Sequence, residues 1–448
     1  MNRSPGHTTG QTSRSRIAAV VGVIAAICAL MTSSAAAAAP TPPQQDPFYR
    51  YTGSTPLASI APGTVLKTRA LSYHIVGIPL PVSVVQLLYR TTGSLGQPTV
   101  DVTSVIKPAL GLGANRVVAY GSFYDSLDPI DDPSYVLAGG TPTGSSEAQE
   151  DNYFIAQLLL AGDTVVDADT EGESADFAAG REYGTDTLDS VRAAFNSPAT
   201  GISAQAKVAL VGYSGGAIAT DWAAELAPSY APDVNRRLIG ASYGGVFVDP
   251  IHNLFYVSGS QGWGGVLPMA LIGLGRAFGV DLTPYLSSYG ASVVNALQNS
   301  GIGNATNSYP GLTWQQLVKP QYANPESIPV LDKLSNELTM GTGGTPTEPQ
   351  LIVQGTNGAP DGTAPSAQYG TGDGVMVAGD VRSLAREYCA AGVPVRYQEA
   401  DLSHEQTALA AWWPLTAGWL AARFSGAGAP QNCSSIPPGN SLAPVSAP

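Results

Sequence analysis

Ser214 is the residue of this sequence best suited to nucleophilic chemistry. It lies in VALVGYSGGAIAT, residues 208–220, where an apolar run is followed by the pattern G-x-S-x-G and then by an alanine-rich stretch. In a strand-to-helix turn of this kind, the flanking glycines make room for a strained, exposed serine. The N–H of Gly215, at the start of the helix, can donate to a developing oxyanion. We therefore predict a nucleophile; the alternative is an ordinary glycine turn with a capping serine.

A serine hydroxyl needs a neighbouring base, and the chain has only four histidines. His7 lies in the N-terminal leader, His74 in an early β-like run, and His252 just after a strand-like segment. His404 follows a late strand in EADLSH. Because nucleophile, acid and histidine follow one another in this order in α/β folds of this type, we predict His404 as the base. The alternative for each histidine is a surface position in a loop.

The third member should be a carboxylate in the loop after the strand-like run LIVQG, where it would orient the imidazole. The candidates are Asp361, Asp373 and Asp380. We predict Asp373 and keep Asp361 as the alternative. The non-catalytic interpretations are a helix N-cap for Asp373, a turn for Asp361 and a helix-surface charge for Asp380.

These residues need a scaffold, and the sequence predicts an α/β fold. Strand-like and helix-like segments alternate, which is typical of a mostly parallel central sheet covered by helices on both faces. The predicted strands are 115–124, 164–172, 207–211, 237–248, 349–355 and 393–400, and the predicted helices are 151–162, 184–197, the stretch after Gly215, 375–392 and 407–424.

A long interruption, residues 252–348, separates two parts of the predicted core, 40–251 and 349–448. It is apolar, helix-like and punctuated by Gly and Pro. Such long insertions are uncommon between sheet strands and are often functional. We predict a helical lid or cap over an apolar acyl site; the alternative is additional packing.

The first 39 residues have the layout of a secretory signal peptide. Basic residues precede a 15-residue apolar run, 17–31, and small residues between Ala35 and Ala39 offer a cleavage site. An uncleaved anchor is the alternative, but a membrane span usually needs about 20 apolar residues. We predict export to the medium or the cell envelope.

Charge and cysteine content limit the partners. The formal net charge is −13, and loss of three leader arginines makes it more negative, which disfavours nucleic acid and anionic membranes. Outside the leader only Cys389 and Cys433 remain, and in an exported chain they are expected to form one disulfide. A Cys–His metal site is the alternative, without a supporting spacing. Lipidation of Cys28 is not favoured, because Ile27 stands where a small residue is needed.

At this point the chain resembles the secretory lipase family of the α/β-hydrolase superfamily, found in fungi and actinobacteria. The resemblance spans nearly the whole chain after the leader and implies lipase or carboxylesterase activity with a helical lid. It is carried by DPFYRY, APGTVLKTR, DADTEG, TLDSVRAAF, KVALVGYSGGAIATDWAAELAPSYAPD, LIVQGT, GDGVMVAGDVRSLAREYCAAGVPV and the late SH.

The resemblance also implies site residues. The loop D-x-E-G implies that the N–H of Asp169 pairs with that of Gly215 as the second oxyanion donor, and the aspartate before GVMV is again Asp373. This chain departs from the family by lengthening the acid loop with NGAPDGTAPSAQYGTG and by carrying Met376 where a proline is usual. It also lacks a cysteine near 128–135, so one family disulfide is expected to be missing.

Together these observations predict a serine ester hydrolase that acts through an acyl-enzyme on lipids or small esters. No metal and no organic cofactor are expected. The lid is expected to contact lipid interfaces transiently. Two alternatives remain, namely acyl transfer to an alcohol or cell-wall sugar by the same triad, and a non-catalytic envelope protein with a broken triad. A peptidase is less favoured.

Overall fold

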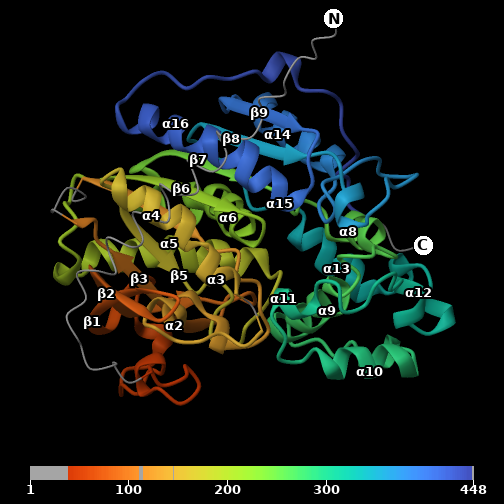
Figure 1. Ribbon diagram of the computed structural model, residues 1–448, viewed down its shortest axis with the longest axis horizontal. Helices are drawn as coiled ribbons and strands as arrows, with labels where there is room; N and C mark the ends of the chain where they lie inside the picture. Colours follow the sequence, from red (N-terminus) through yellow and green to blue (C-terminus); the bar gives the residue numbers. More distant parts are fainter. Residues whose placement is uncertain (1–38, 110–114, 145, 446–448) are drawn as a thin grey trace, which may run out of the picture. The chain divides into compact units, whose positions relative to one another are not determined.

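A nine-stranded sheet forms the centre of the fold, with the strand order β1-β2-β3-β5-β4-β6-β7-β8-β9 (Figure 1). The structure, a computed structural model, describes residues 39–109, 115–144 and 146–445, so nearly all of the predicted leader lies outside the described residues. The strands are β1 (Val65–Ile75), β2 (Ile78–Thr92), β3 (Pro98–Ile106), β4 (Arg116–Gly121), β5 (Thr164–Ala168), β6 (Lys207–Tyr213), β7 (Leu238–Gly244), β8 (Gln350–Gly355) and β9 (Val395–Ala400).

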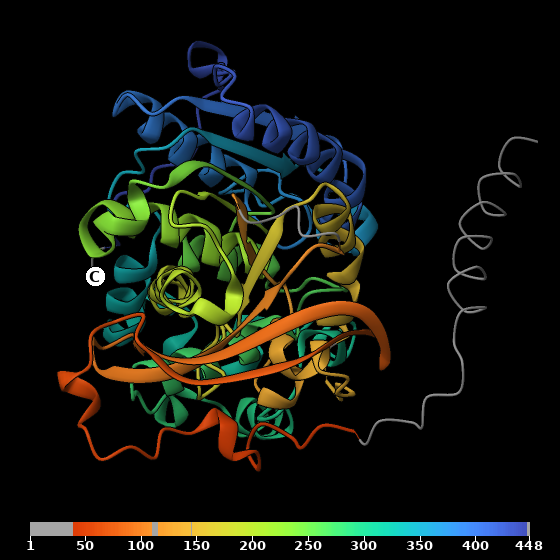
Figure 2. The same ribbon diagram turned by 90° about the vertical axis from the view of Figure 1, so that its left-hand side faces the viewer.

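Strand direction divides the sheet into two parts. β1, β2, β3 and β5 pair antiparallel, with a long β1–β2 hairpin at the edge (Figure 2). From β5 through β4 and β6 to β9 all pairing is parallel. Parallel strands bring their carboxyl ends to the same edge, where the loops that carry functional side chains collect. The predicted α/β architecture is confirmed.

Helices cover both faces because alternate side chains of the buried strands point to opposite sides. In β6, Val208 and Leu210 join the core that contains α5 and α6, whereas Ala209 and Val211 join the core that contains α4 and α16. The helices in and around these layers are α2 (Pro133–Leu137), α3 (Glu147–Glu150), α4 (Asn152–Leu160), α5 (Gly180–Asn196), α6 (Gly215–Tyr230), α7 (Pro232–Asn235), α14 (Ala378–Ala390), α15 (His404–Thr407) and α16 (Trp413–Phe424).

The chain between β7 and β8 is helical. Its Trp314, Leu317 and Ile328 belong to a hydrophobic cluster that also includes Phe177 and Val377 from outside this segment. Its helices gather at the lower right of Figure 1. They are α8 (Pro250–Val257), α9 (Val266–Ala277), α10 (Ser288–Ala296), α11 (Ile302–Ala305), α12 (Trp314–Leu317) and α13 (Pro329–Leu338). These helices belong to the same structural unit as the sheet, Pro40–Pro448. The division into two core parts and a lid stays a prediction.

The last helical segment differs from the single helix predicted over 407–424. α15 ends at Thr407, and a π-helical turn, Ala408–Trp412, leads into α16. The turn lies beside a cluster of aromatic rings, in which Phe154 of α4 contacts both Trp412 and Trp413 edge-on. Packing across the sheet is not visible in the local pattern of apolar residues, so the helix was predicted without its π-turn. Among the described residues, no helix is long and apolar enough to cross a membrane.

Candidate active site

Ser214 stands in the sharp turn between β6 and α6. Its φ of 54° lies in the left-handed region, which non-glycine residues rarely adopt. The turn is tight enough to require its glycines, because a Cβ on Gly212 would lie 2.1 Å from the carbonyl oxygen of Gly216. The N–H of Gly215 is one of the first in α6 and has no acceptor within the helix. The local geometry is that of a nucleophile elbow.

The structure brings Ser214, His404 and Asp373 together from three separate loops. His404 Nε2 lies 2.8 Å from Ser214 Oγ, and His404 Nδ1 lies 2.8 Å from Asp373 Oδ2. The carboxylate fixes the tautomer with the proton on Nδ1, which leaves Nε2 free to accept the serine proton. The imidazole and the carboxylate are both buried, so the pair is shielded from water.

Asp373 is held by contacts to both of its carboxylate oxygens. Oδ1 accepts the backbone N–H groups of Val375 and Met376 at 3.1 and 2.8 Å. Oδ2 accepts from Gln354 at 2.9 Å as well as from His404. These contacts satisfy both oxygens of a fully buried carboxylate.

The charge of Asp373 controls the basicity of His404. Burial lowers the pKa of the imidazole, but the charge of Asp373 and the hydrogen bond to it raise it, and Asp361 and Glu405 add to this effect. The net result is a pKa above the ordinary value of 6.5. The histidine is therefore a stronger base than a free imidazole, at the cost of remaining protonated to a higher pH.

The structure does not bring Asp169 to the serine, contrary to the prediction that it supplies the second oxyanion donor. Its backbone N–H donates to the carbonyl of Val102 at 3.0 Å, and its carboxylate accepts from the N–H and hydroxyl of Ser134 at 2.8 and 2.5 Å. The N–H is thus already used in the contact with β3. Burial raises the pKa of this carboxyl to about 7, although the bonds from Ser134 oppose the shift.

Asp125, which the sequence reasoning missed, lies beside Gly215 instead. It follows β4, the strand next to β6, and lines the same cavity as Ser214 and Gly215. A Cβ on Gly215 would lie 1.8 Å from Asp125 Oδ1, so the two residues are in direct contact. Burial raises the pKa of the Asp125 carboxyl well above its ordinary value. Burial thus favours the uncharged form of this carboxyl, which would repel an oxyanion less than a carboxylate would.

The loop 169–172 nevertheless contributes to the site indirectly. Glu171 accepts the N–H of Ser126 at 3.1 and 3.0 Å and the hydroxyl of Tyr183 at 2.8 Å. It thereby fixes the residue after Asp125. The local sequence could not show this, because it does not reveal that β4, rather than β5, neighbours β6.

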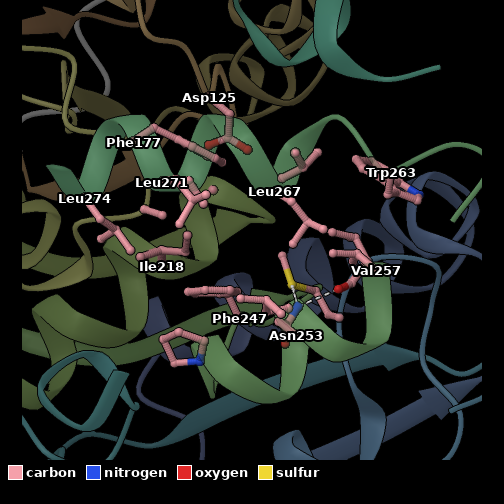
Figure 3. Close-up of a pocket in the computed structure, with 18 of the residues that line it drawn as sticks. Asp125, Phe177, Ile218, Phe247, Asn253, Val257, Trp263, Leu267, Leu271 and Leu274 are labelled. Carbon is pink, nitrogen blue, oxygen red and sulfur yellow. Dashed lines mark hydrogen bonds between the residues drawn. The ribbon is translucent and has the colours of Figure 1, made fainter. Parts of the chain in front are cut away.

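An apolar cavity opens beside Ser214, with a volume of about 90 Å³ that the centre of a water-sized molecule can reach. Figure 3 shows side chains from the helical insertion and from the core meeting around it, with Asp125 at its edge. Its lining includes Phe177, Ile218, Phe247, Leu267, Leu271 and Leu274. An apolar lining of this kind suits a hydrocarbon chain.

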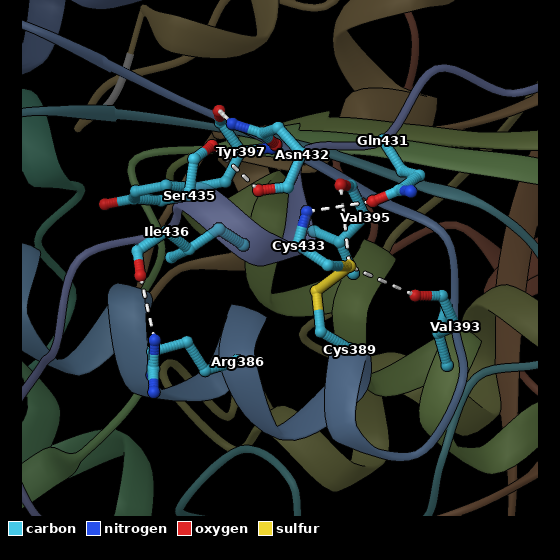
Figure 4. The surroundings of a disulfide bond; sticks show 10 residues. All are labelled: Arg386, Cys389, Val393, Val395, Tyr397, Gln431, Asn432, Cys433, Ser435 and Ile436. Carbon is cyan, nitrogen blue, oxygen red and sulfur yellow. Dashed lines mark hydrogen bonds between the residues drawn. A yellow bond between two sulfur atoms is a disulfide. The ribbon is translucent and has the colours of Figure 1, made fainter.

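The predicted disulfide is confirmed. Cys389, near the end of α14, is bonded to Cys433 in the tail, with a Cα–Cα distance of 5.6 Å (Figure 4). Arg386 donates to the carbonyl of Ile436 at 2.8 Å and adds a second tie between helix and tail. The bridge lies away from the cavity residues and closes a loop of 44 residues, which stabilises the fold by restricting the unfolded chain.

The remaining candidates lie at different distances from the reacting atoms. Asp361 Oδ2 is 3.3 Å from the backbone nitrogen of His404 but does not contact the ring. His252 pairs with Asp380 at 3.0 Å, and His74 contacts the carbonyl of Ser72. In the described part of the chain, no group of three or more His, Cys, Asp or Glu residues could hold a metal ion.

The sheet order, the serine elbow and the helix layers are those of an α/β-hydrolase. A solved structure of Candida antarctica lipase A in its closed state shares the fold, with a TM-score of 0.74, 24% identity and coverage of 92% of this chain and 93% of that one. The family model described as secretory lipase matches residues 139–432. The chain belongs to the secretory lipase family, and its class is that of the ester hydrolases, as the sequence predicted.

Relatives support this membership along most of the chain. Lipase 2 of Candida albicans (strain SC5314 / ATCC MYA-2876) is 30% identical over 92% of this chain and 88% of its own. A protein of Mycobacterium tuberculosis (strain CDC 1551 / Oshkosh) described as a probable inactive lipase is 31% identical over 86% of this chain and 83% of its own. With Lipase 4 of the same Candida strain, the alignment spans only 52% of the relative.

Proposed function

We propose that this protein hydrolyses acyl esters of lipids through a Ser214–His404–Asp373 triad and an acyl-enzyme. The observation that carries the proposal is the continuous pair of 2.8 Å contacts from the serine hydroxyl through the imidazole to the carboxylate. Membership of the secretory lipase family supports the reaction class.

The first half-reaction forms the acyl-enzyme. His404 Nε2 takes the proton of Ser214 as Oγ attacks the ester carbonyl, and Asp373 stabilises the imidazolium. The N–H groups of Gly215 and Asp125 receive the oxyanion; removing one such donor costs about 100- to 1000-fold in rate in comparable sites. His404 then gives its proton to the leaving alcohol.

The second half-reaction releases the acid. Water occupies the place of the departed alcohol, and His404 removes a proton from it as it attacks the acyl carbonyl. Collapse of the second tetrahedral intermediate returns the proton to Ser214. Each proton therefore passes through one nitrogen, Nε2, which is the atom that the structure leaves without a carboxylate partner.

The apolar cavity supports a lipid-like acyl group of medium or long chain. Its lining is almost wholly hydrocarbon, and helices α8 and α9 of the insertion supply much of it. We infer that the insertion acts as the predicted lid. A series of p-nitrophenyl esters from acetate to oleate tests this, with kcat/KM expected to rise towards the longer chains.

We also infer export by a cleaved leader. Disulfides form and persist in oxidising compartments, and the family is described as secretory. Recovery of the chain from the medium or envelope with a new N-terminus after residue 35, 36, 37, 38 or 39 would support this inference. Retention of the intact leader would contradict it.

Labelling with a fluorophosphonate tests whether Ser214 is reactive. The wild-type chain should be labelled and should hydrolyse p-nitrophenyl butyrate, whereas Ser214→Ala should do neither. Ser229→Ala, which removes an exposed hydroxyl from the same helix, is the matched control and should behave as wild type. A wild-type chain that is neither labelled nor active would instead favour the non-catalytic alternative, as the description of the Mycobacterium relative suggests for that protein.

A further inference from the structure

The long loop before Asp373 brings a second carboxylate to the site. Asp361 Oδ2 lies 3.3 Å from the backbone nitrogen of His404, whose N–H has its shorter contact, 2.7 Å, with the carbonyl oxygen of Asp373. Both aspartates therefore hold the main chain at the histidine, while only Asp373 reaches its ring. The lengthened loop thus adds a contact at the histidine without displacing the acid.

The same loop is joined to the start of the helical insertion by buried hydroxyls. Ser260 Oγ lies 2.6 Å from Thr363 Oγ1, which donates to the carbonyl of Gly374 at 2.6 Å. Ser260 Oγ also accepts the N–H of Trp263 at 3.0 Å. Since Thr363 uses its proton on Gly374, the proton between the two hydroxyls belongs to Ser260. A continuous chain of hydrogen bonds thus links the insertion to the turn that carries Asp373.

Trp263 and Tyr213 both place their rings against the imidazole of His404. The ring of Trp263 meets that of His404 edge-on at 5.4 Å. The space around it is full, because a Cβ on Gly374 would lie 2.9 Å from Asp361 Oδ2 and 3.1 Å from Trp263 Nε1. Gly374 also has a φ of 125°, which only glycine adopts readily. Asp361 and Trp263 therefore both lie against Gly374, next to Asp373, so movement of Asp361 would open space in the acid turn beside the tryptophan.

We propose that Asp361 is a positioning residue of the active site, which holds the main chain at His404 and keeps Trp263 packed against the imidazole. The proposal rests on the function proposed above for its effect on the reaction. It gives the lengthened loop a role in the site, although the family pattern has a shorter loop. Asp361 acts through His404 and does not touch the reacting atoms.

The charge of Asp361 provides a readout that a purely structural residue would not affect. The charged groups that act on the imidazole are Asp373, Asp361 and Glu405, in decreasing order, all raising its pKa against the effect of burial. Loss of the charge at Asp361 should lower the pKa of His404 and so move the acid limb of kcat/KM to lower pH.

The test compares Asp361→Asn with Asp401→Asn, which removes an exposed charge from the same approach to His404. In Asp361→Asn we expect the acid limb to shift down by about half a pH unit and kcat to fall about threefold to tenfold, with a smaller change in KM. Asp401→Asn should leave both close to wild type. An unchanged pH profile and kcat in Asp361→Asn would overturn the proposal.

Two further measurements keep the proposal testable. Asp361→Ser retains a hydrogen-bond acceptor without the charge and should give the same pH shift. Thr363→Val keeps the side-chain volume but breaks the chain of hydroxyl hydrogen bonds. The loss of kcat in the double variant with Asp361→Asn should therefore be smaller than the product of the two single losses. A loss of kcat in the double variant equal to the product of the two single losses would count against a shared network.

Direct titration separates this proposal from the proposed function. The chain has four histidines, so the imidazole signal of His404 can be assigned in a 13C-histidine NMR spectrum by its loss in His404→Gln. A lower pKa in Asp361→Asn supports the proposal even if no ester is hydrolysed. An unchanged pKa of His404 in Asp361→Asn contradicts the proposal even if Ser214→Ala abolishes activity.

Discussion

In the described part of the chain, His404 and His252 each pair with a buried aspartate, and the two pairs differ in what faces the second ring nitrogen. His404 contacts Asp373 at 2.8 Å and presents Nε2 to the hydroxyl of Ser214. His252 contacts Asp380 at 3.0 Å, but its Nε2 lies 3.8 Å from a second carboxylate, that of Asp249.

This difference separates a base from a structural cation. The two carboxylates around His252 raise the pKa of its imidazole and so favour the form with a proton on each nitrogen, which has no lone pair to accept another. The ring is also covered by Tyr369, stacked at 4.0 Å. A histidine–aspartate pair alone therefore does not indicate catalysis. The group that faces the other ring nitrogen decides whether the histidine can act as a base.

The strongest way to break the comparison is to replace each histidine by glutamine. His404→Gln should lower kcat/KM for p-nitrophenyl butyrate by about 10⁴-fold or more, because the serine loses its base. His252→Gln should keep activity within about twofold, since that ring does not face the cavity. A comparable loss in both variants would show that the second pair also serves the reaction.

A methyl group at the proposed oxyanion site should have the next largest effect. Gly215→Ala would press a Cβ against Asp125 Oδ1, displace the loop and cost about 100-fold in kcat. In an Asp125→Gly background the methyl has room, so the same substitution should cost less. If Gly215→Ala costs the same in both backgrounds, the assignment of Asp125 in place of Asp169 is wrong.

The pH profile should report His404 and not His252. The pKa of His404 is raised above 6.5, and only the neutral ring can act as base, so kcat/KM should fall about tenfold per pH unit below that raised pKa. His252→Gln should leave the profile in place. A profile that moves with His252→Gln would contradict the assignment.

The smallest expected effect is on stability. Contacts with Asp380 and Asp249 raise the pKa of His252 against the effect of burial. The cation therefore stabilises the fold below about pH 6.5, and this contribution is lost as pH rises through the raised pKa. His252→Gln should reduce the free energy of unfolding by about 1 kcal/mol at pH 6 and by less at pH 9, as measured by denaturant titration. An equal loss at both pH values would show that His252 is not held as a cation.

Local pattern was sufficient for much of this structure. The apolar strand before Ser214, the glycines around it and the single late histidine, His404, predicted the elbow and its base. Strand and helix alternation predicted the parallel sheet. Two cysteines outside the leader were enough for the disulfide.

Contacts between segments distant in sequence could not be read in the same way. The resemblance to the family implied Asp169 through its D-x-E-G loop, and Asp125 was not considered, because only the sheet order shows that β4 is the neighbour of β6. Asp361 and Asp373 both come close to His404, and only the fold of the long loop decides which one meets the ring.

The protonated carboxyl of Asp169 has a consequence for the molecule as a whole. With a pKa of about 7 when folded and about 4 when unfolded, this group takes up a proton as the chain folds at intermediate pH. Asp151, also buried, behaves in the same way, with a pKa of about 7. Unfolding near pH 6 therefore releases protons to the solution, and these two groups favour the native state more in mild acid than at neutral pH.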